Sequence, residues 1–445
     1  MSFARLLPTA AVFLIGLSVW VGTGVPLGPI TLQAAQVATV TVAAVALAAA
    51  SLARRPPLAG LHPIVGALSS AVAGATLLVT IAALLSSIGA PDTVSTLRFI
   101  MRYVFGLVLV VALLHFLRSR RMLRWLERAL LLGATASVAI AALGFAIPSL
   151  GALTIRYGDR AQGLLNHPNQ LAIVLLAVTP IALAVALRSP RRIGGWAALL
   201  LVAGGIAFTG SKANLLLLAV SLPALALLTA YLRPDPLVQV RTALRLMVAA
   251  AAAAAGAYWI VLRFNPRTLA TLERLLDDPW STSTVVSRSE MWGTALRVGL
   301  DHPWFGVGAD QARFHLPHSH AHNVVLEFFL TMGAVGLVAL IALVSAWLTV
   351  AVFSLWIAYT RTRRPFADRL GLLAYPASLL LYVASNQSSD SFGGTTLPIA
   401  WIATAMALGH LDVVLRERLP ADDTATAAPV RSLAETIPAA RASQP

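Results

Sequence analysis

The chain has 445 residues, of which 58% are hydrophobic and 11% charged, with a formal net charge of +15. A soluble domain has roughly a quarter of its residues charged, so this composition indicates a membrane protein. The absence of cysteine excludes disulfides, a thiolate nucleophile and Cys-ligated zinc. The arginines lie in short clusters between apolar runs, which is typical of membrane topology and argues against nucleic-acid binding.

Apolar runs long enough to cross the hydrocarbon core as helices recur along the chain. The first run lacks a clear cleavage site, so we expect an uncleaved helix. Arginine clusters follow the even-numbered runs, which predicts that both termini are cytoplasmic. The pattern predicts an all-α polytopic membrane protein with about twelve transmembrane helices. They fall near residues 6–25, 30–52, 61–88, 98–117, 129–149, 168–187, 193–209, 213–231, 243–262, 322–356, 370–387 and 396–413.

The connection over residues 263–321, between spans 9 and 10, is the longest and is predicted to be extracytoplasmic. Its aromatic and aliphatic residues can pack, and they predict short helices, one of them over residues 290–300 with an apolar side along the membrane surface. We therefore expect a transmembrane domain over residues 1–420 that includes this loop as its catalytic part. Residues 421–445 are rich in Ala, Thr, Pro and charge, and are predicted to be a disordered cytoplasmic tail.

Five of the nine histidines lie between residues 302 and 322. Histidine titrates near neutral pH, so it suits a general base and a metal ligand alike. The alternation His318-Ser-His320-Ala-His322 would gather the three side chains on one face only in a strand, whereas His322 begins an apolar helix. The pattern therefore favours a general base over a metal site, and histidines that are simply exposed remain an alternative.

Arginines on the predicted outer side are a second unusual feature. Arg156 and Arg160 precede the sixth span, and Arg288 begins the loop helix. They would either extend to lipid headgroups or hold an anion, because guanidinium makes bidentate contacts with phosphate oxygens. The nearby Asn166-His-Pro168 also fits a purely structural role, since proline suits the first turn of a helix.

Three blocks occur in a fixed order. They are Arg160-Ala-Gln-Gly-Leu-Leu-Asn-His-Pro-Asn169; then Ser211-Lys212; then Ser287-Arg288 through Trp292, Asp301-His-Pro-Trp-Phe-Gly-Val-Gly308, His322-Asn323, Glu327, Gly333 and Gly336. In order and spacing they resemble the O-antigen ligase and polymerase superfamily of bacterial polysaccharide assembly.

The resemblance implies an inner-membrane enzyme that takes a glycan from undecaprenyl pyrophosphate and joins it to a hydroxyl of a lipid or glycan acceptor outside the cytoplasm. It implies that Arg160 and Arg288 hold the donor pyrophosphate and that His322 deprotonates the acceptor. It also implies an inverting reaction without a metal or another cofactor. Five further residues are expected to bind substrate: Arg156, Lys212, Asn169, His320 and Asn323.

Two choices stay open within this family. Arg156 is an alternative to Arg160 as the donor contact, and Lys212 stands where the family often has arginine. Both a ligase and a polymerase fit the resemblance, because they share the donor and differ in the acceptor.

A transporter or lipid-linked glycan flippase is the alternative from another functional class. Such carriers usually place ionisable residues near the middle of the membrane, where the substrate crosses. The spans predicted here are poor in ionisable residues, with Arg98 and Arg102 at the start of the fourth span as exceptions. This distribution favours an enzyme.

Overall fold

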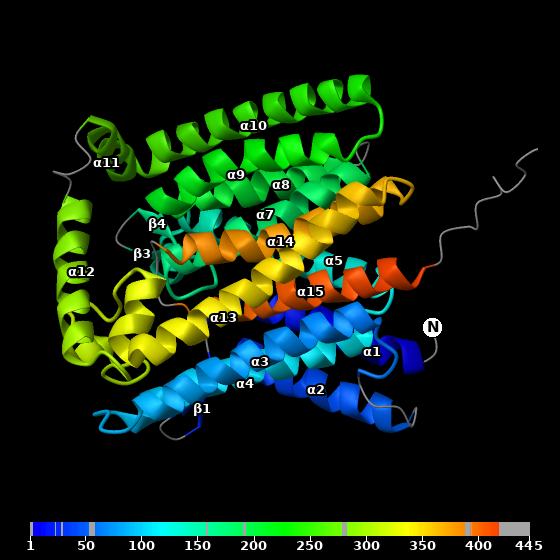
Figure 1. Ribbon diagram of the computed structural model, residues 1–445. Coiled ribbons are helices and arrows are strands. Elements are labelled where there is room, and N and C mark those ends of the chain that lie inside the picture. Colours follow the sequence, from blue (N-terminus) through cyan, green and yellow to red (C-terminus); the bar gives the residue numbers. More distant parts are fainter. Residues whose placement is uncertain are drawn as a thin grey trace, which may run out of the picture.

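The computed structural model describes residues 3–22, 24–27, 30–52, 58–156, 159–189, 193–277, 283–387, 392 and 394–417. Within these ranges, ten helices are long and apolar enough to cross a membrane, and two shorter apolar helices run beside them (Figure 1). They follow the predicted spans in order, which confirms an all-α polytopic membrane protein. The predicted tail over residues 421–445 lies outside the described residues.

Each predicted span corresponds to one helix of the bundle. The helices begin where a capping side chain or a proline meets an apolar run. For example, His167 Nδ1 accepts a hydrogen bond from the Asn169 amide (3.1 Å) directly beside Pro168. The bounds are α1 (Phe3–Ser18), α2 (Ala34–Leu52), α3 (Pro63–Ser86), α4 (Thr93–Phe116), α5 (Arg120–Gly144), α7 (Pro168–Arg188), α8 (Ile193–Phe208), α9 (Lys212–Tyr231), α10 (Pro236–Phe264), α13 (Val324–Thr360), α14 (Phe366–Ser385) and α15 (Leu397–Arg416).

Short elements connect these helices. They are β1 (Gly24–Leu27), β2 (Ile30–Gln33), α6 (Pro148–Thr154), β3 (Ile155–Arg156), β4 (Arg160–Ala161), α11 (Pro266–Asp277), α12 (Ser283–Asp301) and the 3-10 helix η1 (Ala312–Phe314). Both strand pairs are antiparallel hairpins, with Gly24 opposite Gln33 and Arg156 opposite Arg160. The first span is shorter than predicted, because α1 ends at Ser18 and the chain then forms the β1–β2 hairpin.

Helix α7 is buried along nearly its whole length and packs against α8 and α14. Helix α13 crosses the bundle against α3 and α14, while α10 lies at the edge beside α8 and α9. Helix α12 runs across the ends of the other helices instead of along them (Figure 1). We call this end of the bundle the loop end. The predicted loop helix is thus longer than residues 290–300, and its exposed side carries Leu296 and Leu300, whereas the Trp292 indole N–H bonds the Ala321 carbonyl.

The opposite end, here called the arginine end, holds Arg118, Arg120, Arg188, Arg233, Arg364, Arg369 and Arg416. Two ion pairs tie its helices together. Arg120 contacts both carboxylate oxygens of Asp368 at 2.7 Å. Arg188 lies 2.5 Å from Glu127, which also accepts a hydrogen bond from the Tyr375 hydroxyl (2.7 Å). Because buried charges require such partners, these contacts fix the packing of α5, α7 and α14 at this end.

Candidate active site

Segment 303–308 lies across α13 at a break in that helix. Gly333 has φ 63° and ψ −155°, a conformation that only glycine adopts readily. The break lets the Ala334 amide donate to the Pro303 carbonyl (2.8 Å) instead of to its own helix. A Cβ atom on Gly333 would lie 2.4 Å from the carbonyl carbon of Trp304. The glycine therefore allows two backbones to touch and fixes the loop to α13.

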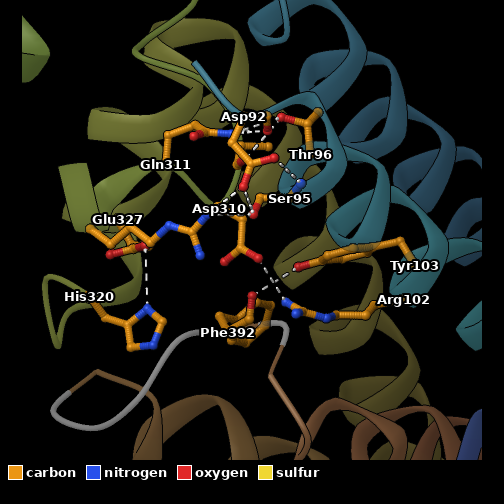
Figure 2. A network of polar contacts seen from close by, with 12 residues as sticks. Asp92, Ser95, Thr96, Arg102, Tyr103, Asp310, Gln311, His320, Glu327 and Phe392 are labelled. Atoms are coloured by element: carbon orange, nitrogen blue, oxygen red, sulfur yellow. Dashed lines mark hydrogen bonds and ion pairs between the residues drawn. The ribbon is translucent and has the colours of Figure 1, made fainter. Parts of the chain in front are cut away.

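The next residues of the loop bind the turn between α3 and α4. The Ala309 amide donates to the Ser86 hydroxyl (3.1 Å). Gln311 donates through its amide nitrogen to the Asp92 carbonyl, and the Arg313 guanidinium pairs with the Asp92 carboxylate (Figure 2). The loop is thus held on two sides, by α13 and by the α3–α4 turn.

An open cavity of about 650 Å³ lies at the loop end. Its walls come from the start of α4, the start of α7, loop residues 310–322 and the turn over residues 394–396. Two predicted site residues, His320 and His322, line it. The volume is within the range of small-molecule sites, roughly 300–1,000 Å³.

A carboxylate and an arginine meet in this cavity. Arg102 Nη1 lies 3.5 Å from Asp310 Oδ2 (Figure 2). His320 Nδ1 lies 3.9 Å from Glu327, which accepts a hydrogen bond from the Ala321 amide (2.7 Å). Burial raises the pKa of Asp310, and the charges of Arg102, His320 and Arg313 act against this rise. These residues thus surround the Asp310 carboxyl, which is mostly enclosed.

The backbone is unusual at two residues of this cavity. Asp310 (φ 63°) and His322 (φ 50°) are the non-glycine residues with positive φ in the described part of the chain. Asp and His enter this region more readily than most residues, but it remains uncommon for them. Such conformations are maintained where the surroundings impose them, often at functional sites. Both side chains line the cavity, so the unusual geometry coincides with the predicted base.

Three predicted donor-binding cations gather at a second location of the loop end. Arg160 and Arg288 both lie close enough to the Lys212 ammonium to act on it electrostatically. Arg160 is held in place by two acceptors, since its Nε donates to the Thr209 carbonyl (2.8 Å) and its Nη2 to Asn169 Oδ1 (2.7 Å). We call Arg160, Lys212 and Arg288 the cation cluster.

The turn before α9 places Lys212 in this cluster. Gly210 adopts φ 61°, and a Cβ atom there would lie 2.8 Å from the Thr268 hydroxyl. The Asn214 amide nitrogen donates to the buried Ser211 hydroxyl (2.9 Å), which fixes the first turn of α9. The tight packing around Gly210 thus holds Lys212 beside the β3–β4 hairpin and its Arg160.

The remaining predicted residues have structural contacts as well. Arg156 is exposed, and its Nε donates to Gln162 Oε1 (3.0 Å). Asn323 caps α13 by accepting a hydrogen bond from the Leu326 amide (3.1 Å). The structure therefore brings Arg160, and not Arg156, into contact with Asn169, and it places Asn323 directly after His322.

The start of α7 connects the two locations. His167 and Gln170 line the cavity, while Asn169, between them in sequence, bonds Arg160 of the cation cluster. One helical turn therefore contributes to both, with consecutive residues directed to different sides. The arrangement can hold an anion at the cluster and a second group beside His322 in the cavity.

Sequence reasoning missed three residues that line the cavity: Asp310, Arg313 and Gln170. Arg98 and Arg102, which the sequence marks as exceptions within a span, also line it. The two arginines are four residues apart, so both lie on one face of α4, and this spacing could have identified them from the sequence. Asp310 gave a weaker signal, as a lone acidic residue after Gly306 and Gly308. In the part of the chain that the structure describes, no three His, Asp or Glu side chains are grouped to hold a metal ion.

Residues 197–341 match the family model described as O-antigen ligase. The matched segment runs from α8 into α13, so it contains Lys212, Arg288 and His322, while Arg160 precedes it. No curated protein shows a significant match to the chain. The match covers the second and third sequence blocks, and the first block, residues 160–169, precedes it. This match over residues 197–341 supports a place for the chain in the O-antigen ligase/polymerase superfamily of membrane proteins.

Proposed function

We propose that this enzyme transfers a glycan from undecaprenyl pyrophosphate to a hydroxyl of a lipid or glycan acceptor, without a metal ion and with inversion at the anomeric carbon. The observation that carries the proposal is the position of α7. Its first turn contacts Arg160 of the cation cluster through Asn169 and lines the cavity of His322 through His167 and Gln170. A donor at the cluster and an acceptor in the cavity would therefore meet across one helical turn.

The cation cluster supports a pyrophosphate ligand. Arg160 and Arg288 both act electrostatically on Lys212, and an anion bound between the three side chains would offset this repulsion. Arginine offers bidentate contacts to phosphate oxygens, and lysine adds a point charge. Arg160, Lys212 and Arg288 would thus stabilise the charge that develops on the leaving group, which is the main catalytic requirement when the leaving group is already good.

An apolar groove beside this cluster supports a lipid-linked donor. It has a volume of about 340 Å³ and lies between α9, α10 and α11. Leu215, one turn after Lys212, lines it together with Ala254 and Leu269. A polyprenyl chain in this groove would have its pyrophosphate at the cluster, since the groove begins within one turn of Lys212.

His322 would act as the general base. The acceptor oxygen forms a bond with the anomeric carbon, and the bond from that carbon to the pyrophosphate oxygen breaks. The electron pair of the broken bond leaves with undecaprenyl pyrophosphate, and the hydroxyl proton passes to His322. Direct displacement by the acceptor inverts the configuration, and the protein contributes mainly positioning, charge and one proton acceptor.

The arginine end supports an orientation in which this end of the bundle faces the cytoplasm. Clustered arginines favour the cytoplasmic side, which would place both termini there and the loop end outside. In a bacterium this membrane is the inner one, where the lipid-linked donor would face outward. The cavity and the cation cluster would then both lie on the extracytoplasmic side.

The test is transfer by purified protein with undecaprenyl-pyrophosphate-linked glycan as donor. Lipid-linked glycan and core-type oligosaccharide are supplied separately as acceptors, each with and without EDTA. We expect transfer that persists in EDTA, and the acceptor used would separate a polymerase from a ligase. Transfer that EDTA abolishes would contradict the metal-independent reaction. Glycan that crosses the bilayer of a proteoliposome without any transfer would instead indicate a flippase.

A further inference from the structure

The cavity contains buried oxygen atoms that lack a hydrogen-bond partner. Gln170 Oε1, on the first turn of α7, and Thr395 Oγ1, before α15, are both buried and have no partner among the described residues. Most buried polar atoms in proteins are satisfied, so atoms left open in a cavity indicate where a ligand or water bonds. The two belong to different elements but line the same space.

Asp310 adds a carboxylate to the same wall. An ionised carboxylate only accepts hydrogen bonds, and so does an amide oxygen such as Gln170 Oε1. Arg102 Nη1 approaches one carboxylate oxygen of Asp310, Oδ2, at 3.5 Å, which is longer than a charge-assisted hydrogen bond. This pair therefore orients the carboxylate without a close bond to it.

We infer that Asp310, Gln170 and Thr395 form the binding site for the acceptor sugar, with Asp310 as its main specificity-determining residue. The inference rests on the proposed function and deepens it. The Asp310 carboxylate and Gln170 Oε1 only accept hydrogen bonds, and the Thr395 hydroxyl can accept or donate one, so the three groups favour a ligand with several donors. A sugar ring with free hydroxyl groups is such a ligand. His322, which lines the same cavity, would then face one hydroxyl of the bound ring.

The surrounding charges complete this site. Arg98 lies one turn before Arg102 at the start of α4 and also lines the cavity, so it can donate to ring or hydroxyl oxygens, whereas Arg102 approaches Asp310. The backbone contacts of the loop with α13 and the α3–α4 turn hold Asp310 at its positive φ. The carboxylate thus has a fixed position before any sugar binds, which reduces the ordering cost of binding.

The test measures KM for each substrate in the transfer assay, with the acceptor that the wild-type protein uses. Asp310→Asn removes the charge but keeps the size, and asparagine also tolerates positive φ, so the loop should keep its backbone. We expect the acceptor KM to rise about tenfold to a hundredfold, as for the loss of a hydrogen bond to a charged group. The donor KM should stay within about twofold, because the cation cluster is separate.

A double variant distinguishes sugar binding from simple neutralisation of Arg102. If Asp310 only balances the arginine charge, Arg102→Gln together with Asp310→Asn should restore the acceptor KM. If Asp310 binds the sugar, the double variant stays impaired. Thr395→Val removes one hydroxyl and should raise the acceptor KM by about threefold to tenfold. Glu417→Gln is the matched control, since it removes an ion-paired carboxylate at the arginine end and should change neither KM.

Three outcomes would overturn the inference. The first is an unchanged acceptor KM in Asp310→Asn, and the second is full recovery in the double variant. The third is an equal rise of donor and acceptor KM with a lower Tm, which would indicate a structural role for Asp310. Failure of the proposed function is a separate result, because the wild-type protein itself would then transfer glycan to no acceptor.

Discussion

Gly333→Ala tests whether the break in α13 fixes segment 303–308 of the loop. An alanine at φ 63° and ψ −155° enters a region that is essentially restricted to glycine, at about 1–3 kcal/mol. Its Cβ would also lie 2.4 Å from the carbonyl carbon of Trp304, so one backbone must move, at about 1–3 kcal/mol more. We therefore expect a loss of about 2–6 kcal/mol in the free energy of unfolding, or release of segment 303–308 from α13.

Two measurements detect these outcomes. Thermal denaturation of detergent-solubilised protein reports the loss of stability, and trypsin cleavage after Arg313, mapped by mass spectrometry, reports release of the loop. Released loop residues would carry Asp310 away from its place in the cavity, so acceptor use should fall while binding of undecaprenyl pyrophosphate is retained. Gly74→Ala is the matched control, because a Cβ there meets no atom within 4 Å.

The reasoning would be refuted by a Gly333→Ala variant that melts and is cleaved like Gly74→Ala. Such a result would mean that α13 accepts a side chain at the break and that segment 303–308 does not depend on the close backbone crossing. Equal destabilisation by both substitutions would also contradict it, since Gly74 is exposed and unhindered.

Three further predictions concern single side chains. His322→Ala should fold and enter membranes, as judged by size-exclusion chromatography, but transfer should fall by about 10²–10⁴-fold; equal activity would exclude it as the base. Arg288→Lys keeps the charge and loses the bidentate geometry, so its donor KM should rise, whereas Lys212→Arg should keep its donor affinity; the reverse order would contradict the assignment of the cluster. Hydrogen bonds from Ser95 lower the pKa of Asp92 below its ordinary 3.8, with a further contribution from Arg313. The stability difference between wild type and Asp92→Asn should therefore be complete above pH 3.8 and be lost as the pH falls through the lower folded-state value. Thermal melts across this range check it, and a difference already lost at about pH 5 would contradict the lowered pKa.

The helical spans were predictable because a membrane requires long apolar runs, and each run became one helix of the bundle. The end of the first span was not, because the limit of α1 at Ser18 depends on pairing between β1 and β2. Composition does not reveal this strand pairing, because the residues that pair are mostly apolar, like those of the span before them. The same holds for α11, whose residues are amphipathic but belong to a loop that the sequence describes only as long.

The candidate site was predictable in its residue types but not in its geometry. Charge and titration favoured a histidine base and arginines on one side of the membrane, and the family resemblance singled out His322, Arg160 and Arg288. The sequence could not show that Arg102 on α4 meets Asp310, because that contact joins segments more than two hundred residues apart and depends on how the loop lies on the α3–α4 turn. Asn323 is the opposite case. Its position directly before an apolar run already allows the helix cap that the structure shows.

The first turn of α7 lies between two locations that are constrained differently in evolution. On one side it contacts the cation cluster, whose ligand would be the same in every relative that shares the donor. On the other side it lines a cavity whose walls also come from α4, the loop and the turn before α15. If the cavity binds the acceptor as proposed, substitutions in those walls would change which sugar is accepted without moving Arg160, Lys212 or Arg288. A lineage could therefore acquire a new surface glycan while its leaving-group chemistry stayed the same.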